Sequence, residues 1–248
     1  MDRSLYVAMS GAKQTLMAQT TNANNLANTQ TSGFKSDFEQ FRSQPVFGPG
    51  YPTRVYAMNE RSGTNVSPGA LQTTANPLDV AIKGDGWLAV QDASGQEAYT
   101  RAGDLKVTSD GLLQTNSGLP VMGNAGPIAL PPYDKIIMGK DGTISIVPVG
   151  GDSATMTTVN RITLVKPDNA DLEKRDDGLM HLKPSVQAAP QPDANVQLVQ
   201  GALEGSNVNA VTAMVEMIEL ARNFELQTKV MRTVDEDSAA SAKLMKMS

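Results

Sequence analysis

The spacing of apolar residues at the two ends of the chain is the feature that most constrains its fold. Near the N-terminus these residues lie alternately four and three positions apart, which is the heptad spacing of a helix with one apolar seam. The same spacing recurs near the C-terminus. The two rows are Leu5, Met9, Ala12, Leu16, Gln19, Ala23 and Leu26 in the first segment, and Ala213, Met217, Leu220, Phe224, Gln227, Met231 and Val234 in the second. The pattern predicts an N-terminal helix of about 25 residues, roughly 38 Å long, and a long C-terminal helix.

Each predicted helix needs a partner for its seam. An isolated helix is marginal in water, and neither segment has another helical pattern beside it in the sequence. The two helices therefore pair with each other, or they pair with helices of other copies of the chain. Gln19 and Gln227 interrupt the seams, and a polar seam residue can fix the register of a coiled coil. A plain helical hairpin that caps the rest of the chain is an equally good interpretation.

Composition slightly favours packing between subunits. Residues 14–32 contain no charged side chain, and 13 of these 19 residues are Asn, Gln, Ser or Thr. The solvated face of a helix normally carries charged residues, so an uncharged polar face indicates burial against other polar surfaces. An amphipathic helix of weak helix propensity explains the same composition as well.

The middle of the chain follows a different period. Short runs such as 80–82, 87–90 and 144–147 are strand-like, and turns such as Asp110-Gly111 separate them. Short strands bounded by turn residues predict an antiparallel β domain and argue against βαβ units. Segments rich in proline and glycine flank this region and read as extended connectors.

These patterns predict a mixed α and β fold. The long N- and C-terminal helices pair as an α-helical coiled-coil domain, and extended connectors join them to a central, mainly antiparallel β domain. The predicted division is 1–35 for the N-terminal helix and the motif after it, 36–76 for an extended connector, 77–183 for the β domain, 184–204 for a connector and the last strand, and 205–248 for the C-terminal helix.

Charge and residue counts exclude several function classes. A net charge of −5 and a pI of about 5.0 argue against a nucleic-acid binder that relies on phosphate neutralisation. The chain has no Cys and one His, His181, which excludes zinc fingers, thiolate chemistry and His-rich metal sites. We find no apolar stretch suited to a membrane span, and none that reads as a cleavable signal peptide.

The motifs of catalysis and cofactor binding are weak. Residues 84–89 match G-x-G-x-x-A, but strand-like residues follow the glycines where a dinucleotide site needs a helix. His181 lies near Asp176 and Asp177, yet the chain has no G-x-S-x-G elbow to present a nucleophile. Carboxylate pairs for glycoside hydrolysis stay open, because nothing in the sequence selects one pair. We therefore expect no enzyme activity, no cofactor and no metal site.

Three segments resemble the bacterial flagellar rod and hook proteins. Residues 24–35 read N-N-L-A-N-T-Q-T-S-G-F-K and match that family's N-terminal signature, N-N-[LI]-A-N-x-x-T-x-G-[FY]-[KR], at every defined position. Residues 201–222 follow the family's C-terminal pattern, and residues 78–103 follow its central one. Trp87-Leu88 stand where distal rod and hook members usually carry Phe-Phe, so the chain looks most similar to proximal rod members.

The resemblance implies a structural subunit of the flagellar basal-body rod. Subunits of this family pass through the flagellar type III export apparatus unfolded and without a cleaved signal. They then stack helically, and their terminal helices line a hollow shaft that transmits torque and encloses the export channel. A distal rod or hook-type axial protein is the alternative, and a flagellum-exported enzyme acting on peptidoglycan is a remote one.

The implied partners are other copies of the chain, neighbouring proximal and distal rod proteins, and the export apparatus. The implied location is the rod, which spans the periplasm, with no nucleic acid bound and no membrane insertion. The residues expected to pack between subunits are Leu5, Met9, Leu16, Gln19, Leu26, Asn24, Asn25, Asn28, Gly33, Phe34, Met217, Leu220, Phe224, Gln227, Met231 and Val234.

Overall fold

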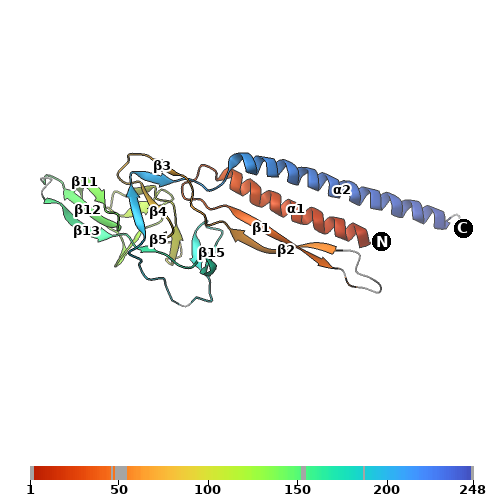
Figure 1. Ribbon diagram of the computed structural model, residues 1–248, viewed down its shortest axis with the longest axis horizontal. Helices are drawn as coiled ribbons and strands as arrows, with labels where there is room; N and C mark the ends of the chain where they lie inside the picture. Colours follow the sequence, from red (N-terminus) through yellow and green to blue (C-terminus); the bar gives the residue numbers. More distant parts are fainter. Residues whose placement is uncertain (1–2, 46, 48–54, 152–154, 187, 247–248) are drawn as a thin grey trace. The chain divides into compact units, whose positions relative to one another are not determined.

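The computed structural model of the chain describes residues 3–45, 47, 55–151, 155–186 and 188–246 (Figure 1). The chain divides into two compact units. A helix–hairpin unit comprises Met1–Thr29, Ser36–Asn65 and Val208–Ser248, and a β unit comprises Gln30–Lys35 and Val66–Asn207. The chain therefore passes between the units near residues 30, 36, 65 and 207.

The secondary-structure elements follow one another along the chain as two long helices at the ends with short strands between them. They are α1 (Arg3–Ala27), β1 (Asp37–Pro45), β2 (Val55–Thr64), β3 (Leu71–Thr73), β4 (Val80–Lys83), β5 (Trp87–Gln91), β6 (Glu97–Thr100), β7 (Leu105–Val107), β8 (Leu113–Thr115), β9 (Met122–Gly123), β10 (Gly126–Pro127), β11 (Tyr133–Met138), β12 (Thr143–Pro148), β13 (Thr157–Arg161), β14 (Leu164–Val165), the 3-10 turn η2 (Asn169–Asp171), β15 (Leu172–Lys174), β16 (Met180–Leu182), β17 (Gln197–Gln200), β18 (Ala202–Glu204) and α2 (Ala210–Lys246).

In the helix–hairpin unit, α1 contacts both α2 and the β1–β2 hairpin (Figure 1). The two helices are antiparallel, because Asn22 of α1 donates a hydrogen bond to the carbonyl of Ala213 while Gly11 lies against Gln227. Asn209 caps α2, since its Oδ1 accepts hydrogen bonds from the amides of Val211 and Thr212 at 3.0 and 3.1 Å. The cap explains why α2 begins where the strand-rich region ends.

The predicted α-helical coiled-coil domain is wrong as a description of this unit. The unit is built from two helices and a β-hairpin, and α1 buries only part of its predicted seam. Within that seam Ala12 is buried, whereas Met9 and Leu16 are 54% and 52% exposed. A heptad seam serves one partner helix, but α1 packs against two neighbours, so its buried face is turned away from Met9 and Leu16.

The extended connector predicted over 36–76 is also wrong, because much of it forms strands. β1 pairs with β2, and β3 pairs with β18. The register of β1 and β2 shifts between Gln40 and Phe41, as a β-bulge does. Phe38 and Phe41 stand three residues apart in the sequence, which does not follow the alternation that marks a strand. Residues 48–54 of the predicted connector lie outside the described residues, as do 1–2 and 247–248.

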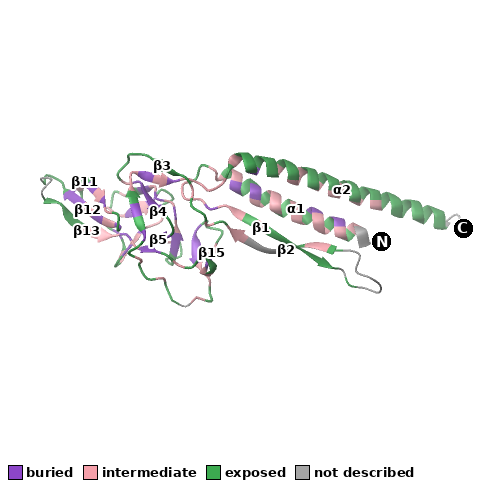
Figure 2. Ribbon diagram, viewed as in Figure 1, coloured by how far each residue is buried: buried purple, intermediate pink, exposed green. Residues whose placement is uncertain are grey.

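The β unit is predominantly antiparallel β structure, as the sequence predicts. One sheet has the strand order β14-β5-β6-β16-β15, and another has the order β11-β12-β13. The unit is closed by strands from its two ends, because β17 pairs with β4 as β18 pairs with β3. Figure 2 shows buried residues concentrated in this unit, whereas α2 is exposed over most of its length.

The largest apolar cluster joins strands that are distant in sequence. Val80 and Ile82 of β4 pack with Leu198 of β17, and the cluster extends to Ile144 and Ile146 of β12. Each fully buried apolar side chain of this size contributes about 1.5–3 kcal/mol. The strand contributed by residues 197–200 is therefore part of the core and not an appendage to it.

We predict that the β unit depends on this late strand. A fragment of residues 66–207 should unfold at a higher urea concentration than a fragment of residues 77–183, because the shorter one exposes Val80 and Ile82. The expected difference is several kcal/mol, at about 1.5–3 kcal/mol for each apolar side chain that loses its cover. Fluorescence of Trp87, the one Trp of the chain, reports the transition. Equal midpoints for both fragments would contradict the role assigned to β17.

Candidate subunit-packing surface

The predicted seam of α2 forms the less exposed face of that helix. Ala213 is buried, and the other members are half-buried; these are Met217, Leu220, Phe224, Gln227, Met231 and Val234. Ala213 and Gln227 contact α1 directly. The heptad spacing therefore identified the side of α2 that faces its partner within the chain.

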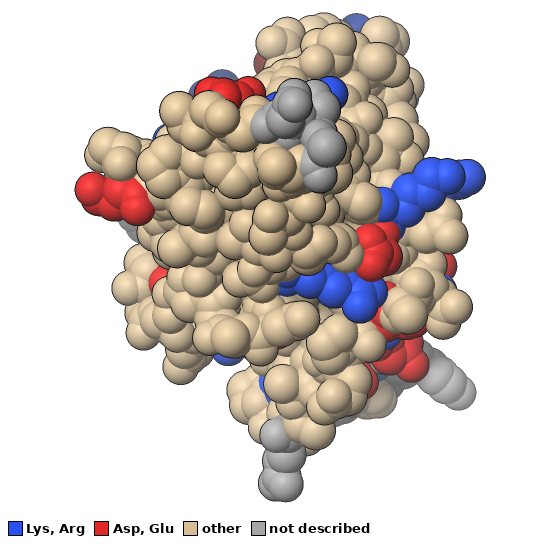
Figure 3. Space-filling view, turned by 90° about the vertical axis from the view of Figure 1, so that its left-hand side faces the viewer, with Lys and Arg blue, Asp and Glu red and all other residues tan. Residues whose placement is uncertain are grey.

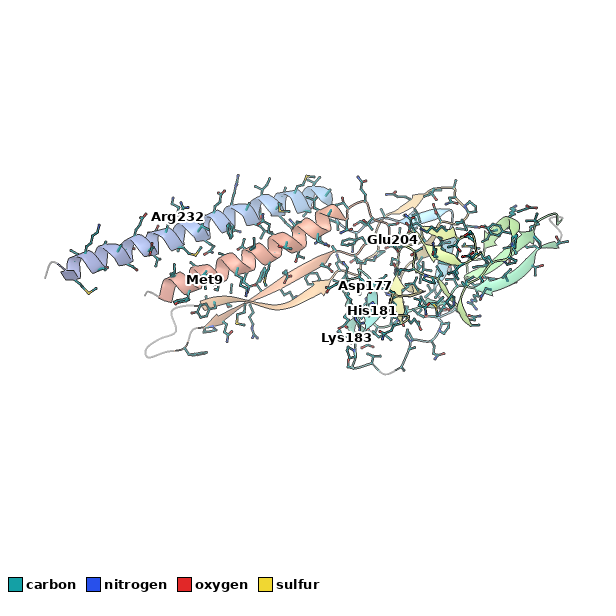
Figure 4. All side chains as sticks on the ribbon, turned by 180° about the vertical axis from the view of Figure 1, so that it is seen from behind. Met9, Asp177, His181, Lys183, Glu204 and Arg232 are labelled. Carbon is teal, nitrogen blue, oxygen red and sulfur yellow. The ribbon has the colours of Figure 1, made fainter. Side chains whose placement is uncertain are left out.

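The predicted residues of α1 divide between the inside and the outside of the unit. Leu5, Gln19 and Leu26 are half-buried, whereas Met9 and Leu16 are exposed. Figure 4 labels Met9, whose side chain projects from α1 near the start of the helix. The exposed pair leaves apolar surface on α1 that this chain does not cover.

Two asparagines of α1 tie the helix to its neighbours. Asn22 donates to the carbonyl oxygen of Ala213 at 2.7 Å. Asn25 makes a two-way link to the backbone of Asp37, because its Nδ2 donates to the carbonyl at 2.7 Å and its Oδ1 accepts from the amide at 2.9 Å. An amide side chain carries both a donor and an acceptor. This explains why uncharged polar residues stand where α1 meets other backbone.

The other two predicted asparagines have different surroundings. Asn28 donates from Nδ2 to the carbonyl of Asn24 at 2.9 Å, which satisfies a free carbonyl in the last turn of α1. Asn24 itself is exposed. Asn25 is therefore a predicted asparagine whose side chain links two elements, α1 and β1.

The outer face of α2 carries an apolar stripe near its N-terminal end. Val211 is 72% exposed and Ile218 is 55% exposed, with Met214 and Val215 similarly exposed between them. These four residues, called the outer stripe below, lie at i, i+3, i+4 and i+7 and so share one side of the helix. Contiguous exposed apolar surface marks interaction sites in soluble proteins.

A buried cluster of charges, here called the linker anchor, holds the end of the N-terminal motif in the β unit. Glu204 is fully buried, and its carboxylate pairs with Lys35 at 2.6 Å and with Arg101 at 2.8 Å. Glu204 Oε1 also accepts from the amide of Gly69 at 2.9 Å. Lys35 donates a further hydrogen bond to the carbonyl of Ser67 at 2.8 Å. Burial lowers the pKa of Lys35, and the hydrogen bond with Glu204 opposes that effect.

Gly33 and Phe34, both predicted packing residues, lie beside the linker anchor. Gly33 has φ +68°, and a Cβ there would stand 2.2 Å from the carbonyl carbon of Arg101, so no other residue fits without a backbone shift. Phe34 receives the ammonium of Lys174 over its ring at 4.1 Å. Its carbonyl accepts from the amide of Asn207 at 3.2 Å. Three segments that lead to the helix–hairpin unit therefore meet at one point of the β unit.

Sequence reasoning missed the linker anchor. Lys35 closes the N-terminal motif and Glu204 falls in the C-terminal pattern, but the sequence does not distinguish a buried charge from a solvated one. The nearest signal is Glu204 in a run of small and apolar residues just before Gly205. The turn at Gly84–Gly86 leads into strand β5, so a dinucleotide site has no helix N-terminus there.

Charge on the surface is mixed. The face shown in Figure 3 is mainly uncharged, and its acidic and basic side chains stand in small groups of both signs. A face of this kind lacks the basic patch of a nucleic-acid-binding surface. Among the described residues, neither helix is both long enough and apolar enough to cross a membrane.

Comparison with known proteins identifies the class of the chain. Family models match three segments: the flagella basal body rod protein model at residues 5–35, the flagellar hook protein FlgE/F/G D1 domain at 81–146, and the flagellar basal body rod FlgEFG protein C-terminal model at 199–244. The chain belongs to the family of flagellar basal-body rod proteins. The resemblance stated from its motifs is confirmed.

The relatives include flagellar basal-body rod proteins of two types, FlgF and FlgG. The chain is 43% identical to the flagellar basal-body rod protein FlgF of Escherichia coli K12 and 42% identical to that of Salmonella typhimurium LT2, in both cases over 100% of each chain. It is 30% identical to the flagellar basal-body rod protein FlgG of Agrobacterium fabrum, over 98% of this chain and 100% of the relative. The chain is thus a structural subunit of the flagellar basal-body rod, with greater similarity to FlgF than to this FlgG.

We predict that the linker anchor is required for the stability of the β unit. Glu204→Ala should lower the free energy of unfolding by about 3–5 kcal/mol, because Lys35 and Arg101 would stay buried without their counter-charge. Urea unfolding followed by Trp87 fluorescence measures the loss. The matched control is Glu173→Ala, which removes the carboxylate of an exposed pair with Arg175 and should cost about 0–1 kcal/mol. Similar losses of unfolding free energy in the two variants would show that the linker anchor contributes no more to stability than an exposed ion pair.

Proposed function

We propose that this chain polymerises helically through its terminal helices and so forms a segment of the hollow drive shaft. In this arrangement α1 and α2 of neighbouring subunits line the tube, the β unit lies outside, and the shaft transmits torque and encloses the export channel. The neighbours are other copies of the chain and the proximal and distal rod proteins. The subunit reaches the rod through the flagellar type III apparatus without a cleaved signal, and its role is mechanical and not enzymatic.

The observation that carries this proposal is the outer stripe of α2. A soluble helix pair would be expected to cover its large apolar side chains or to replace them with charged ones. Here Val211, Met214, Val215 and Ile218 face away from the seam that packs on α1. Surface of this kind is stabilised when another helix covers it. Helical stacking of subunits supplies such helices at every position along the tube.

The exposed part of α1 extends the same argument. Met9 and Leu16 of the predicted packing set are exposed, and Met17 beside them is 42% exposed. Methionine side chains adapt to different surroundings, which suits a surface that must meet neighbours in more than one geometry. Of the predicted packing residues, these outward-facing ones are therefore the best candidates for contacts between subunits, and the seam of α2 serves the fold of the subunit.

We predict that a charge on the outer stripe blocks assembly and leaves the monomer folded. Ile218→Asp should abolish motility and rod incorporation, because the carboxylate would lose its water in the helix–helix contact. The stability of the purified monomer should change by no more than about 0.5 kcal/mol, since the position is exposed there. Ile218→Val is the matched control and should assemble. A swimming Ile218→Asp strain with normal expression would contradict the proposal.

We predict the opposite pattern for the seam of α2. Leu220→Asp should lower the thermal midpoint of the helix–hairpin unit in the monomer, because Leu220 belongs to the half-buried face. Circular dichroism at 222 nm follows this loss of helix as temperature rises. A monomer of Leu220→Asp as stable as the parent chain would show that the seam does not pack within the subunit.

A further inference from the structure

Two adjacent turns of the β unit bring together side chains that are far apart in the sequence. Asp92 lies in the turn between β5 and β6, Asp177 lies in the turn between β15 and β16, and His181 follows on β16. One ligand atom of each residue lies within 4.8 Å of the corresponding atoms of the other two. Figure 4 labels Asp177 and His181, which lie next to each other in the β unit.

The buried imidazole distinguishes this group from an ordinary acidic patch. His181 is 3% exposed, and its Nε2 lies 2.8 Å from Asp177 Oδ2. Two donor atoms that are each about 2.0–2.1 Å from one metal ion lie roughly 3 Å from each other. The Nε2–Oδ2 distance is that of a hydrogen bond, and an ion that displaced the shared proton would find the two atoms near the spacing of neighbouring ligands. Asp92 offers a third ligand atom from the other turn.

Both carboxylates are held in place by their own turns. Asp177 Oδ1 accepts from the amide of Leu179 at 2.9 Å, which leaves Oδ2 directed at His181. Asp92 accepts from the amides of Ser94 and Gln96, each at 2.8 Å. Ligands that are oriented before binding lose little freedom when an ion arrives.

We propose that Asp92, Asp177 and His181 bind one divalent transition-metal ion of the Zn²⁺ type. One imidazole nitrogen and two carboxylate oxygens form a ligand set that such ions accept, and water completes the coordination. Two carboxylates against one imidazole leave an excess of negative charge, which a divalent cation neutralises. The sequence excluded His-rich and Cys-containing metal sites, whereas this site needs a single His.

The ion would join two turns at a place where the sheet has little pairing of its own. Within the described residues, the register between β16 and β6 consists of Met180 opposite Tyr99. A metal ion bound by both turns would add a second link between the β5–β6 hairpin and the β15–β16 hairpin. This role is structural and is independent of the packing proposed for the helices.

The test uses the fact that the chain has one histidine and no cysteine. The untagged full-length chain, kept monomeric at low concentration, is titrated with ZnCl₂ and in parallel with MgCl₂, and ¹H–¹⁵N NMR follows the imidazole nitrogens. We expect Zn²⁺ to shift the His181 resonances with a stoichiometry of one ion per chain and to raise the thermal midpoint. Mg²⁺, which prefers oxygen ligands, should do neither.

Matched variants distinguish Zn²⁺ binding by these three residues from adventitious binding elsewhere on the chain. Asp92→Asn keeps the turn, because the amide oxygen still accepts from the backbone, and should weaken Zn²⁺ binding by more than about tenfold. Asp141→Asn changes a similar turn, in which Asp141 accepts from Thr143, and should leave binding unchanged. Imidazole resonances that do not move in excess Zn²⁺ would overturn the proposal. Equal Zn²⁺ affinity of the parent chain and Asp92→Asn would also overturn the proposal, because it would show adventitious binding only.

Discussion

The ion pairs of the buried Glu204 carboxylate hold together the segments by which the chain enters and leaves the β unit. This carboxylate compensates the charges of Lys35 and Arg101 and accepts a hydrogen bond from the amide of Gly69. Segments that are distant in the sequence are therefore held at one point of the β unit. Lys35, Gly69 and Glu204 all lie close in sequence to the points where the chain passes to the helix–hairpin unit. Removing a single partner of such a cluster leaves uncompensated charge in the interior. The same point contains Gly33, where the close approach of the Arg101 backbone leaves no room for a side chain.

The second constraint acts on α1, which has two neighbours within its unit. Small residues such as Ala8 and Ala12 are buried, and Gly11 lies against Gln227. Small side chains let elements approach closely, but they bury little apolar area. The larger apolar side chains of both helices, Leu16 and Ile218 among them, are left outside. The subunit therefore folds on its own but leaves apolar side chains of both helices exposed. Exposed apolar surface of this kind suits a protein that packs against other subunits in a rod.

The spacing of apolar residues predicted the packing correctly where one face of a helix contacts a single partner. The seam of α2 was predictable because Leu220 and Phe224 face one partner throughout. Sequence reasoning was only partly right for α1, where two partners turn the buried face, and it missed the β1–β2 hairpin, where Phe38 and Phe41 do not follow the alternation of a strand. The linker anchor and the Asp92–Asp177–His181 group were beyond its reach, because each joins segments that are distant in the sequence and only the folded chain places them together.

In the proposed assembly, neighbouring subunits cover the outer stripe of α2 in the rod. Because the chain has no native cysteine, Val215→Cys introduces a unique thiol into that stripe, and its rate of reaction with a maleimide can be compared in the monomer and in purified basal bodies. Ser117→Cys, in an exposed turn of the β unit, is the reference. We expect fast labelling at position 215 in the monomer and strong protection in the rod, with position 117 reactive in both. Equal labelling of position 215 in monomer and rod would contradict the proposed assembly.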